Sequence, residues 1–458
     1  MIGDTAALGA SSSVLADVTG FALGIGPEDI PESARERAAL MLLDTLGICA
    51  AAAPMEAGVL GRKLAVLLHA STDPDHSARM LFDGRSVSLA GAAFAAATQI
   101  DNLDGHDGYN PTLGHIGVVA APTLAVLAQH APDMTGPDAL AALIVCYEVA
   151  GRAAISLHAS VSDYHTSGAW NGLGVAAMAA RLRRHTPAML RESLGIAEYH
   201  GPRSQMMREI ATPTMLHDGS GWGAMVGMSA AILAENGFTG APAITVEAPE
   251  AAPYWADLGS FWQMEHQYVK PYPVCRWAHA SIDAARELAQ AHGFVADDIA
   301  RICIRSFDYA VQLFATMPDT TSKAQYSLPF SVATQLVHGH IGLEHISGAG
   351  LSDPAVAALV ARTTMQAAPQ HQARFPAGRW ADVEITLTDG RVLSSGDTHA
   401  RGGPERPFNQ AKVVKKFLRF AEPVLGEARA KGLCTAVLGL NNPGSRFSDV
   451  AAHLYDPV

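Results

Sequence analysis

The chain has 458 residues, of which 49% are hydrophobic and 17% are charged, and its net charge at pH 7 is −12. This length exceeds what one compact core supports, so we expect about two or three domains. The acidic balance argues against nucleic acid as the main partner, because phosphate binding needs a basic face. The composition predicts a mainly α, soluble protein, and its low charge leaves surface for a second copy, most simply in a homodimer.

The cysteines are odd in number and far apart, and none forms a Cys-x-x-Cys pair. They are Cys49, Cys146, Cys275, Cys303 and Cys434. This spacing argues against a disulfide framework and against a zinc or iron–sulfur site. Residues 1–13 lack a basic stretch ahead of an apolar core, so we expect no signal peptide, and the apolar runs are too short to span a bilayer. We therefore expect a cytoplasmic protein with reduced thiols and no membrane association.

Residues 14–240 predict one helix after another. Pro31 followed by Glu32 indicates a helix start, and small residues crowd the later helices, as close helix packing requires. Glycine-rich breaks at 101–117, 163–174 and 212–223 interrupt this pattern and carry most of the titratable side chains.

The first break holds three carboxylates and two histidines within fifteen residues: Asp101, Asp104, His106, Asp107 and His115. Such a cluster fits a metal site, a solvated loop or an acid–base loop. The irregular spacing argues against the metal. We expect an acid–base loop, whose glycines let the backbone approach a ligand closely.

The helix predicted around residues 142–152 carries Tyr147, Glu148 and Arg152. One interpretation is an ordinary surface pair between Glu148 and Arg152, four residues apart on one face. The other is a tyrosine proton donor beside an arginine that holds a carboxylate.

The second and third breaks also precede helices. His165 and Ser167 lie just ahead of a helix predicted at 172–181, where free N–H groups suit a carboxylate. His165 fits equally well as a residue that caps the helix. His217 has a similar position before a helix rich in small residues.

Residues 270–279 read Lys-Pro-Tyr-Pro-Val-Cys-Arg-Trp-Ala-His. The two prolines restrict the backbone around Lys270. A lysine can move a proton, and Arg276 can grip a carboxylate through two parallel hydrogen bonds. The segment therefore predicts a site for an anionic substrate, although a surface loop before a helix is the alternative.

Beyond residue 298 the pattern changes. Residues 301–307 and 382–388 alternate polar and apolar side chains as half-buried strands do, and Asp389–Gly390 indicates a turn. Helices are expected at 279–291, 327–338 and 354–363. We predict a smaller α+β domain at 271–404, and a large helical domain formed by 1–270 together with 405–458.

Motifs for several common chemistries do not occur. The chain has no Walker loop, no Gly-x-Gly-x-x-Gly after a strand, no Gly-x-Ser-x-Gly elbow and no His-Glu-x-x-His. ATP, NAD, serine-hydrolase and zincin chemistry are therefore unsupported.

In these motifs the chain resembles the MmgE/PrpD family. The resemblance runs through Leu43–Gly47, Asp104–His115, Tyr147–Arg152, Tyr164–Ser167, Leu216–Gly219, Lys270–Pro273, Gln325–Phe330 and Lys415–Phe417. It implies a large all-helical domain with a small α+β lid, a homodimer, and neither cofactor nor metal. It also implies activities such as 2-methylcitrate dehydratase, cis-aconitate decarboxylase and iminodisuccinate epimerase.

The chain departs from the family's pattern in two places. His106 and the glycine at 108 alter the Asp-x-Asp-Asp-Thr motif, and Ile116 replaces a proline after His115. Thr214 stands where family members usually carry a lysine. Both departures leave room for a smaller or differently charged substrate.

We therefore expect proton abstraction next to a carboxylate of a small di- or tricarboxylic acid. Epimerisation is favoured by the two departures; dehydration or decarboxylation is the alternative, and a helical dimer that only binds a carboxylate is a third. The resemblance places Asp104, His115, His165 and Lys270 in the active site. The expected catalytic residues are Lys270, His165, Tyr147, Asp104 and His115. The expected substrate-binding residues are Arg152, His217, Arg276, His106 and Ser167.

Overall fold

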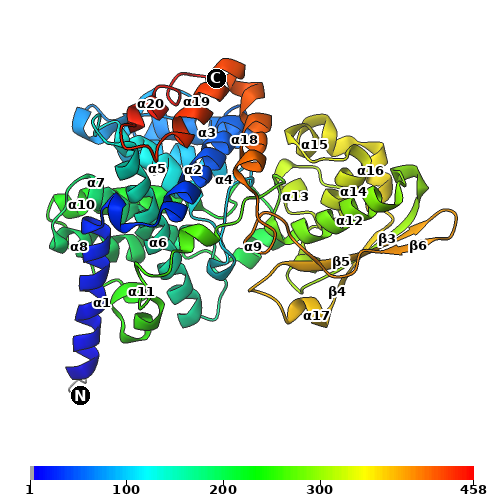
Figure 1. The fold of residues 1–458 in the computed structure, drawn as a ribbon, viewed down its shortest axis with the longest axis horizontal. Coiled ribbons are helices and arrows are strands. Elements are labelled where there is room, and N and C mark those ends of the chain that lie inside the picture. Colours follow the sequence, from blue (N-terminus) through cyan, green and yellow to red (C-terminus); the bar gives the residue numbers. More distant parts are fainter. Residues whose placement is uncertain (1–4) are drawn as a thin grey trace.

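The computed structural model describes the backbone of residues 5–458, and the side chains from residue 14 onward. The expectation about a signal peptide concerns residues 1–13, so its first four residues lie outside the described part. Figure 1 shows a large helical unit on the left and a smaller unit of helices and strands on the right. The protein is mainly α, as predicted.

The helical unit contains most of the elements. They are α1 Thr5–Gly24, α2 Glu32–Ala52, α3 Glu56–Leu68, α4 Leu89–Asp101, α5 Gly117–Ala128, α6 Gly136–Ser160, α7 Asn171–Leu182, α8 Pro187–His200, α9 Met206–Ala211, α10 Ser220–Glu235 and α11 Ile244–Glu247, followed much later by α18 Gln410–Leu425, α19 Glu427–Leu438 and α20 Phe447–Ala451. A short antiparallel hairpin joins β1 Ser77–Arg79 and β2 Ser86–Ser88. The predicted run of helices is confirmed.

Helix α6 lies at the centre of this unit. A Cβ atom at Gly174 of α7 would collide with the Cys146 carbonyl oxygen, so the missing side chain lets α7 approach α6 closely. Among the described residues, α6 is the single unbroken helix long and apolar enough to cross a membrane, and the bent pair α2–α3 passes only if taken as one span. Because 94% of the apolar window of α6 is buried in the protein, a core helix accounts for its composition.

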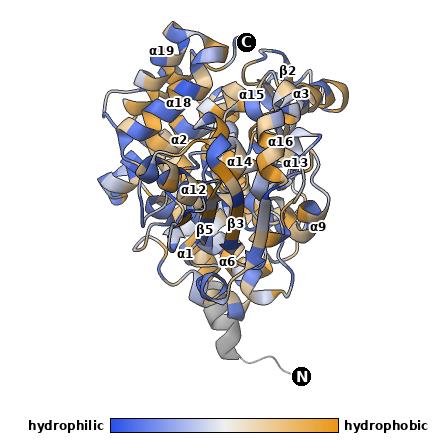
Figure 2. Ribbon diagram, turned by 90° about the vertical axis from the view of Figure 1, so that its right-hand side faces the viewer, coloured by the Kyte–Doolittle hydropathy of each residue, from blue (hydrophilic) through white to orange (hydrophobic). Residues whose placement is uncertain are grey.

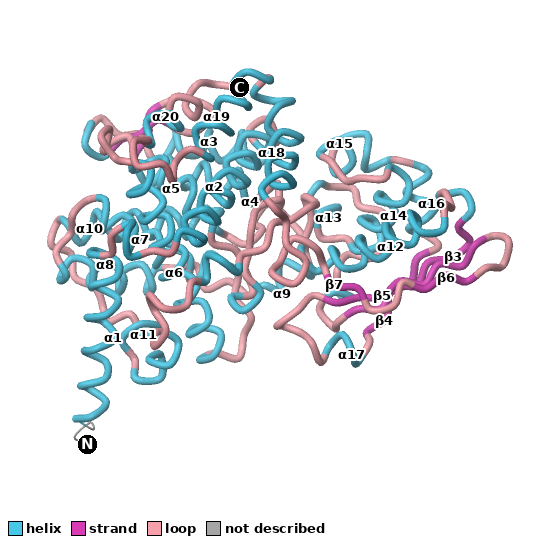
Figure 3. The backbone as a smooth tube through the Cα atoms, viewed as in Figure 1, coloured by secondary structure: helices cyan, strands magenta, loops and turns pink. Residues whose placement is uncertain are grey.

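The smaller unit is an α+β arrangement. Its elements are α12 His279–His292, β3 Ile299–Ser306, α13 Thr321–Gln325, α14 Leu328–His338, α15 Leu343–Ile346, α16 Pro354–Val360, β4 Thr363–Ala367, α17 Pro369–Gln372, β5 Trp380–Leu387, β6 Val392–Ser394 and β7 Thr398–His399. The sheet has the order β4-β3-β5-β6, with β7 paired to β5. Figure 3 shows the strands gathered in this unit, apart from the small hairpin of the helical unit.

Both predicted strands are confirmed as β3 and β5, which pair antiparallel, and Gly390 forms the predicted turn with a φ of +89°. The parallel pairing of β3 with β4 was not predicted, because β4 directly follows α16 without a turn signal. Helices α12, α14 and α16 pack together on the sheet, and Figure 2 shows hydrophobic and hydrophilic residues interleaved along them. The residue boundaries proposed for the two domains stay a prediction.

The chain crosses between the two units twice, and the crossings lie side by side. Val269 donates its N–H to the Gly402 carbonyl oxygen at 3.0 Å. Gly402 has a φ of +93°, and a Cβ atom there would collide with the Val269 carbonyl, so a glycine is needed at this contact.

A second link between distant segments is buried in the helical unit. Lys416 of α18 lies 2.7 Å from the Asp44 carboxylate of α2 and donates a hydrogen bond of 2.6 Å to the Gly105 carbonyl. Both charged side chains are buried. The link therefore fixes the 101–117 loop to the helices behind it.

We predict that Lys416→Met lowers the free energy of unfolding by about 3 kcal/mol, because it leaves the Asp44 carboxylate buried without its partner. Urea unfolding followed by circular dichroism measures this. The neighbouring Lys415 is exposed, and Lys415→Met should change the free energy by less than about 0.5 kcal/mol. Equal effects of the two substitutions would contradict a role for the buried pair.

Candidate active site

A buried ion pair lies where the two units meet. The Lys270 ammonium contacts the Asp104 carboxylate and also donates to the Asp104 carbonyl oxygen at 3.2 Å. Lys270 is fully buried and Asp104 is 4% exposed. Burial disfavours the charged amine, but the neighbouring Asp104 outweighs it and raises the pKa of Lys270. Lys270 is therefore an ammonium at neutral pH.

Local backbone geometry brings these two side chains together. Tyr268 and Gly108 exchange backbone hydrogen bonds of 2.7 and 3.3 Å, which align the segment before Lys270 with the loop. Asp104 has a φ of +53°, a left-handed conformation that few residues other than glycine adopt. This turn places its carboxyl group toward Lys270.

His115 and Asp218 form the second titratable pair. His115 Nδ1 lies 2.6 Å from the Asp107 carbonyl oxygen, so it carries the proton, and the lone pair is on Nε2. Nε2 lies 3.3 Å from Asp218 Oδ2. Burial together with the Asp104 charge raises the pKa of Asp218 to about 6, so this carboxyl group keeps its proton to a higher pH than usual. Burial holds the pKa of His115 well below its usual value.

A small cavity of about 20 Å³ lies beside these pairs, with room for about one water molecule. Its wall comes from both units. The lining residues are Asp104, Leu113, His115, Tyr164, Met206, Asp218, Tyr268, Lys270, Cys275, Arg276, Trp277, Tyr326 and Arg379. The cavity therefore lies where the smaller unit meets the 101–117 loop.

Two buried arginines give this cavity a positive wall. Arg276 stacks on the Tyr268 ring at 4.3 Å and donates to the Arg401 carbonyl at 2.7 Å. Arg379 stacks on Phe375 at 4.7 Å. The Nε atom of each arginine has no hydrogen-bond partner among the described residues. Burial lowers the pKa of Arg276 to about 10, so it stays charged and can bind a carboxylate.

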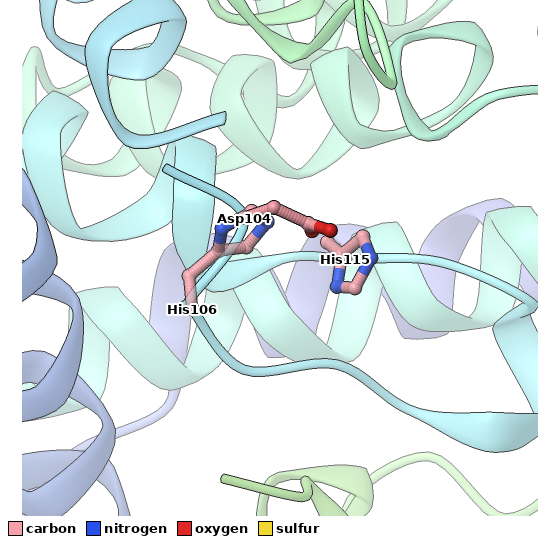
Figure 4. A group of neighbouring side chains, drawn as sticks. All are labelled: Asp104, His106 and His115. Atoms are coloured by element: carbon pink, nitrogen blue, oxygen red, sulfur yellow. The ribbon is translucent and has the colours of Figure 1, made fainter. Parts of the chain in front are cut away.

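His106 lies in the same cluster, with its Nε2 atom 3.9 Å from Asp101 Oδ1. Figure 4 shows it with Asp104 and His115 on one loop. It is fully buried, its ring lies 4.6 Å from that of His115, and neither of its nitrogens has a hydrogen-bond partner among the described residues. One ligand atom from each of the three residues lies within 4.8 Å of the others, so they are the group that could hold a metal ion here. The Lys270 ammonium already neutralises Asp104, however, and this favours the acid–base interpretation.

Tyr147 and Arg152 are among the expected residues that do not line the cavity. The Tyr147 hydroxyl donates a hydrogen bond of 2.7 Å to the Asp107 carboxylate. It thereby positions Asp107, whose backbone carbonyl accepts a hydrogen bond from His115. Arg152 is paired with Glu148 and with Asp257, the latter at 2.8 Å. The Arg152–Glu148 pair is fully buried rather than on the surface, so the surface interpretation was wrong. Both residues stabilise the core of α6.

The 163–174 segment contributes differently from the expectation. Tyr164 lines the cavity, whereas His165 does not, and the His165 N–H donates to His158 at 3.3 Å. His165 does not cap the helix either, because α7 begins without a side-chain cap. Ser167 accepts the His115 N–H at 3.0 Å and bonds Asp218, so it positions this pair.

His217 also lies outside the wall of this cavity. Its Nδ1 atom is 3.5 Å from the hydroxyl of Tyr326, which does line the wall. Arg379 is a lone arginine before a strand, so no local pattern predicts its role, and Asp218 differs from other surface-type acids only by its place beside His217.

Family models match both halves of the chain. The MmgE/PrpD N-terminal domain matches residues 16–251, and the MmgE/PrpD C-terminal domain matches residues 272–441. The chain belongs to the MmgE/PrpD family. The resemblance inferred from the motifs is thereby confirmed.

Curated members of the family are similar along nearly the whole chain. A cis-aconitate decarboxylase of Aspergillus terreus (strain NIH 2624 / FGSC A1156) is 23% identical over 491 residues, which cover 96% of this chain and 95% of the relative. A cis-aconitate decarboxylase-like protein, oryM, of Aspergillus oryzae (strain ATCC 42149 / RIB 40) is 21% identical and covers 93% of this chain. The first of these relatives is a decarboxylase by name, and the second is named as decarboxylase-like.

The raised pKa of Asp218 predicts a pH effect on stability. The folded protein holds this proton up to about pH 6, whereas the ordinary value is 3.8, so Asp218 makes the protein less stable as pH rises from about 4 to 6. Asp218→Asn removes this contribution. Relative to wild type, it should gain about 3 kcal/mol between pH 4 and 7, measured by urea unfolding. A pH-independent difference would contradict the protonated Asp218.

Proposed function

We propose that the protein is a lyase that decarboxylates a small polycarboxylic acid by a cis-aconitate decarboxylase-like reaction. The observation that carries this is the fully buried Lys270 ammonium, which lies between the Asp104 carboxylate and the arginine-lined cavity. Such a group is a proton donor in a site that binds anions.

The proposed step balances as follows. Arg276 and Arg379 bind carboxylates of the substrate through charge-assisted hydrogen bonds. The bond between carbon and the leaving carboxylate breaks, carbon dioxide departs, and the electron pair stays on carbon. The buried cations stabilise that negative charge as it forms. The electron pair is shared with the adjacent double bond, so Lys270 gives a proton to a carbon at one end of this three-carbon system, and solvent returns a proton to the amine.

The state of Lys270 argues against the epimerase. Epimerisation needs a base to remove a proton and a second group on the opposite face of the same carbon. The Asp104 charge keeps Lys270 protonated. The expected partners, Tyr147 and His165, do not line the cavity. A donor that starts in its acidic form suits decarboxylation.

Substrate entry requires motion. A cavity of about 20 Å³ is too small for an acid with two or three carboxylates. The smaller unit supplies Trp277, Tyr326 and Arg379 to the wall. We infer that this unit acts as a lid, which opens to admit the substrate and excludes water when closed.

A second candidate, dehydration, is favoured by the His115–Asp218 pair. The neutral His115 imidazole would remove a proton next to a carboxylate, and the protonated Asp218 would give its proton to the departing hydroxyl group. The products are an alkene and water.

Incubation with cis-aconitate and with citrate in D₂O, followed by NMR, tests these functions. We expect loss of carbon dioxide from cis-aconitate, with one deuterium at an end of the three-carbon system that carried the double bond. Loss of water from citrate would support the hydro-lyase instead, and deuterium exchange with scrambled stereochemistry would support the epimerase. Binding without any turnover would mean a carboxylate-binding protein.

We predict that Lys270→Met lowers kcat by about 10³-fold, because it removes the proton donor. The double variant Asp104→Asn, Lys270→Met removes both charges and should unfold at a urea concentration nearer that of wild type, yet stay inactive. Lys323→Met, on a more exposed lysine of the smaller unit, is the control and should keep wild-type activity. An active Lys270→Met enzyme would remove Lys270 from the mechanism.

A further inference from the structure

A second and far larger cavity lies next to the proposed active site. Its volume is about 870 Å³, within the range of about 300–1,000 Å³ typical of ligand sites, and it lies among α3, α4, α9, α10 and the 212–219 loop. Its apolar lining includes Leu60, Leu64, Phe94, Met215, Leu216 and Trp222. Leu216 is 71% exposed and Trp222 is 49% exposed, although both are large apolar side chains. Such exposure points to a ligand or partner that covers them.

The two cavities share a thin wall. His217 lines the large cavity and its neighbour Asp218 lines the small one. Helix α9 does the same, with Met206 on the small cavity and Arg208 on the large one. His217 also contacts Tyr326 of the small cavity at 3.5 Å. One layer of side chains therefore separates them.

In this wall, His217 has a buried ring nitrogen that could bind a ligand. It has a φ of +46°, which is uncommon for a residue with a side chain. It is 3% exposed, and its Nε2 atom has no hydrogen-bond partner among the described residues. A buried polar atom without a partner is costly, so a ligand that passes His217 would satisfy it.

The geometry points to a substrate with two parts: a polycarboxylate head at Lys270, Arg276 and Arg379, and an apolar chain of several carbons in the large cavity. This assignment rests on the proposed lyase function and adds the substrate class. Thr214, in the loop that lines the large cavity, fits it, because an uncharged residue there does not compete with an apolar chain. Thr214 is held instead by Glu209, which accepts its N–H at 2.8 Å.

A series of substrates tests the assignment in the wild-type enzyme. The probes are cis-aconitate bearing hydrogen, methyl, butyl or hexyl on its CH₂ carbon, together with the corresponding citrates, and the readout is kcat/KM for release of carbon dioxide or water. We expect kcat/KM to rise about fourfold for each methylene that enters the cavity, and at least tenfold from methyl to hexyl.

A substitution that fills the cavity provides the second arm. Leu60 lines the cavity from α3, and Leu67 on the same helix is exposed but does not line it. Leu60→Trp should abolish the preference for the hexyl acid over the methyl acid, whereas the matched control Leu67→Trp should retain it. The ratio of the two kcat/KM values is independent of how much enzyme folds.

The outcomes separate this inference from the proposed function. Turnover of the short acids with no gain along the series overturns the apolar-chain assignment and leaves the lyase standing. Turnover of none of the acids overturns both. A flat series in which Leu60→Trp, but not Leu67→Trp, changes the mass in light scattering assigns the cavity to an interface between two copies of this chain.

Discussion

The buried contact between Lys270 and Asp104 is the constraint around which the two units are arranged. An ammonium with no exposure is stable only beside an opposite charge, so the loop and the segment from 268 to 273 must meet. Lys416 approaches the same loop from behind and holds the Gly105 carbonyl. The 101–117 loop is therefore fixed by two lysines, one from each of two distant parts of the chain.

Burial favours the uncharged forms of the titratable side chains in the cluster. The histidines of the site, His106, His115 and His217, have lowered pKa values because burial disfavours their charged form. The same burial raises the pKa of Asp218. Below about pH 6, protons thus reside on the Asp218 carboxyl group and on Lys270, while the imidazoles are neutral. A site in this state offers acids on the amine and carboxyl groups, and it has bases in the imidazoles.

Local patterns in the sequence predicted some of this and not the rest. The proline-flanked Lys270 segment and the glycine-rich loop with Asp104 and His115 were recognisable, because unusual residues concentrate there. Tyr147 was misplaced because α6 is buried on nearly all sides, and helical spacing alone does not tell which side faces a cavity. His165 was expected at the site, but its neighbour Tyr164 lines the cavity instead, because neighbouring residues in extended backbone point in opposite directions.

Contacts between remote segments were beyond the local patterns. Arg379 reaches the cavity from the start of β5, more than one hundred residues after Lys270, and no motif surrounds it. The predicted domain boundaries do not locate the site on their own; they do so only together with the family resemblance. The large apolar cavity was not predicted either, because its lining comes from α3, α4, α9 and α10, which are distant in the chain.

The paired crossings at Val269 and Gly402 have a mechanical consequence. The two connecting segments cross between the units at one place and are hydrogen-bonded to each other there. They therefore form a single hinge instead of two independent linkers. Swinging the smaller unit on this hinge would carry Arg379 through a wide arc, while Lys270, one residue from the hinge, would scarcely travel. Lys270 would then stay beside the Asp104 carboxylate throughout the catalytic cycle. Only the anion-binding Arg379 would approach and leave the site.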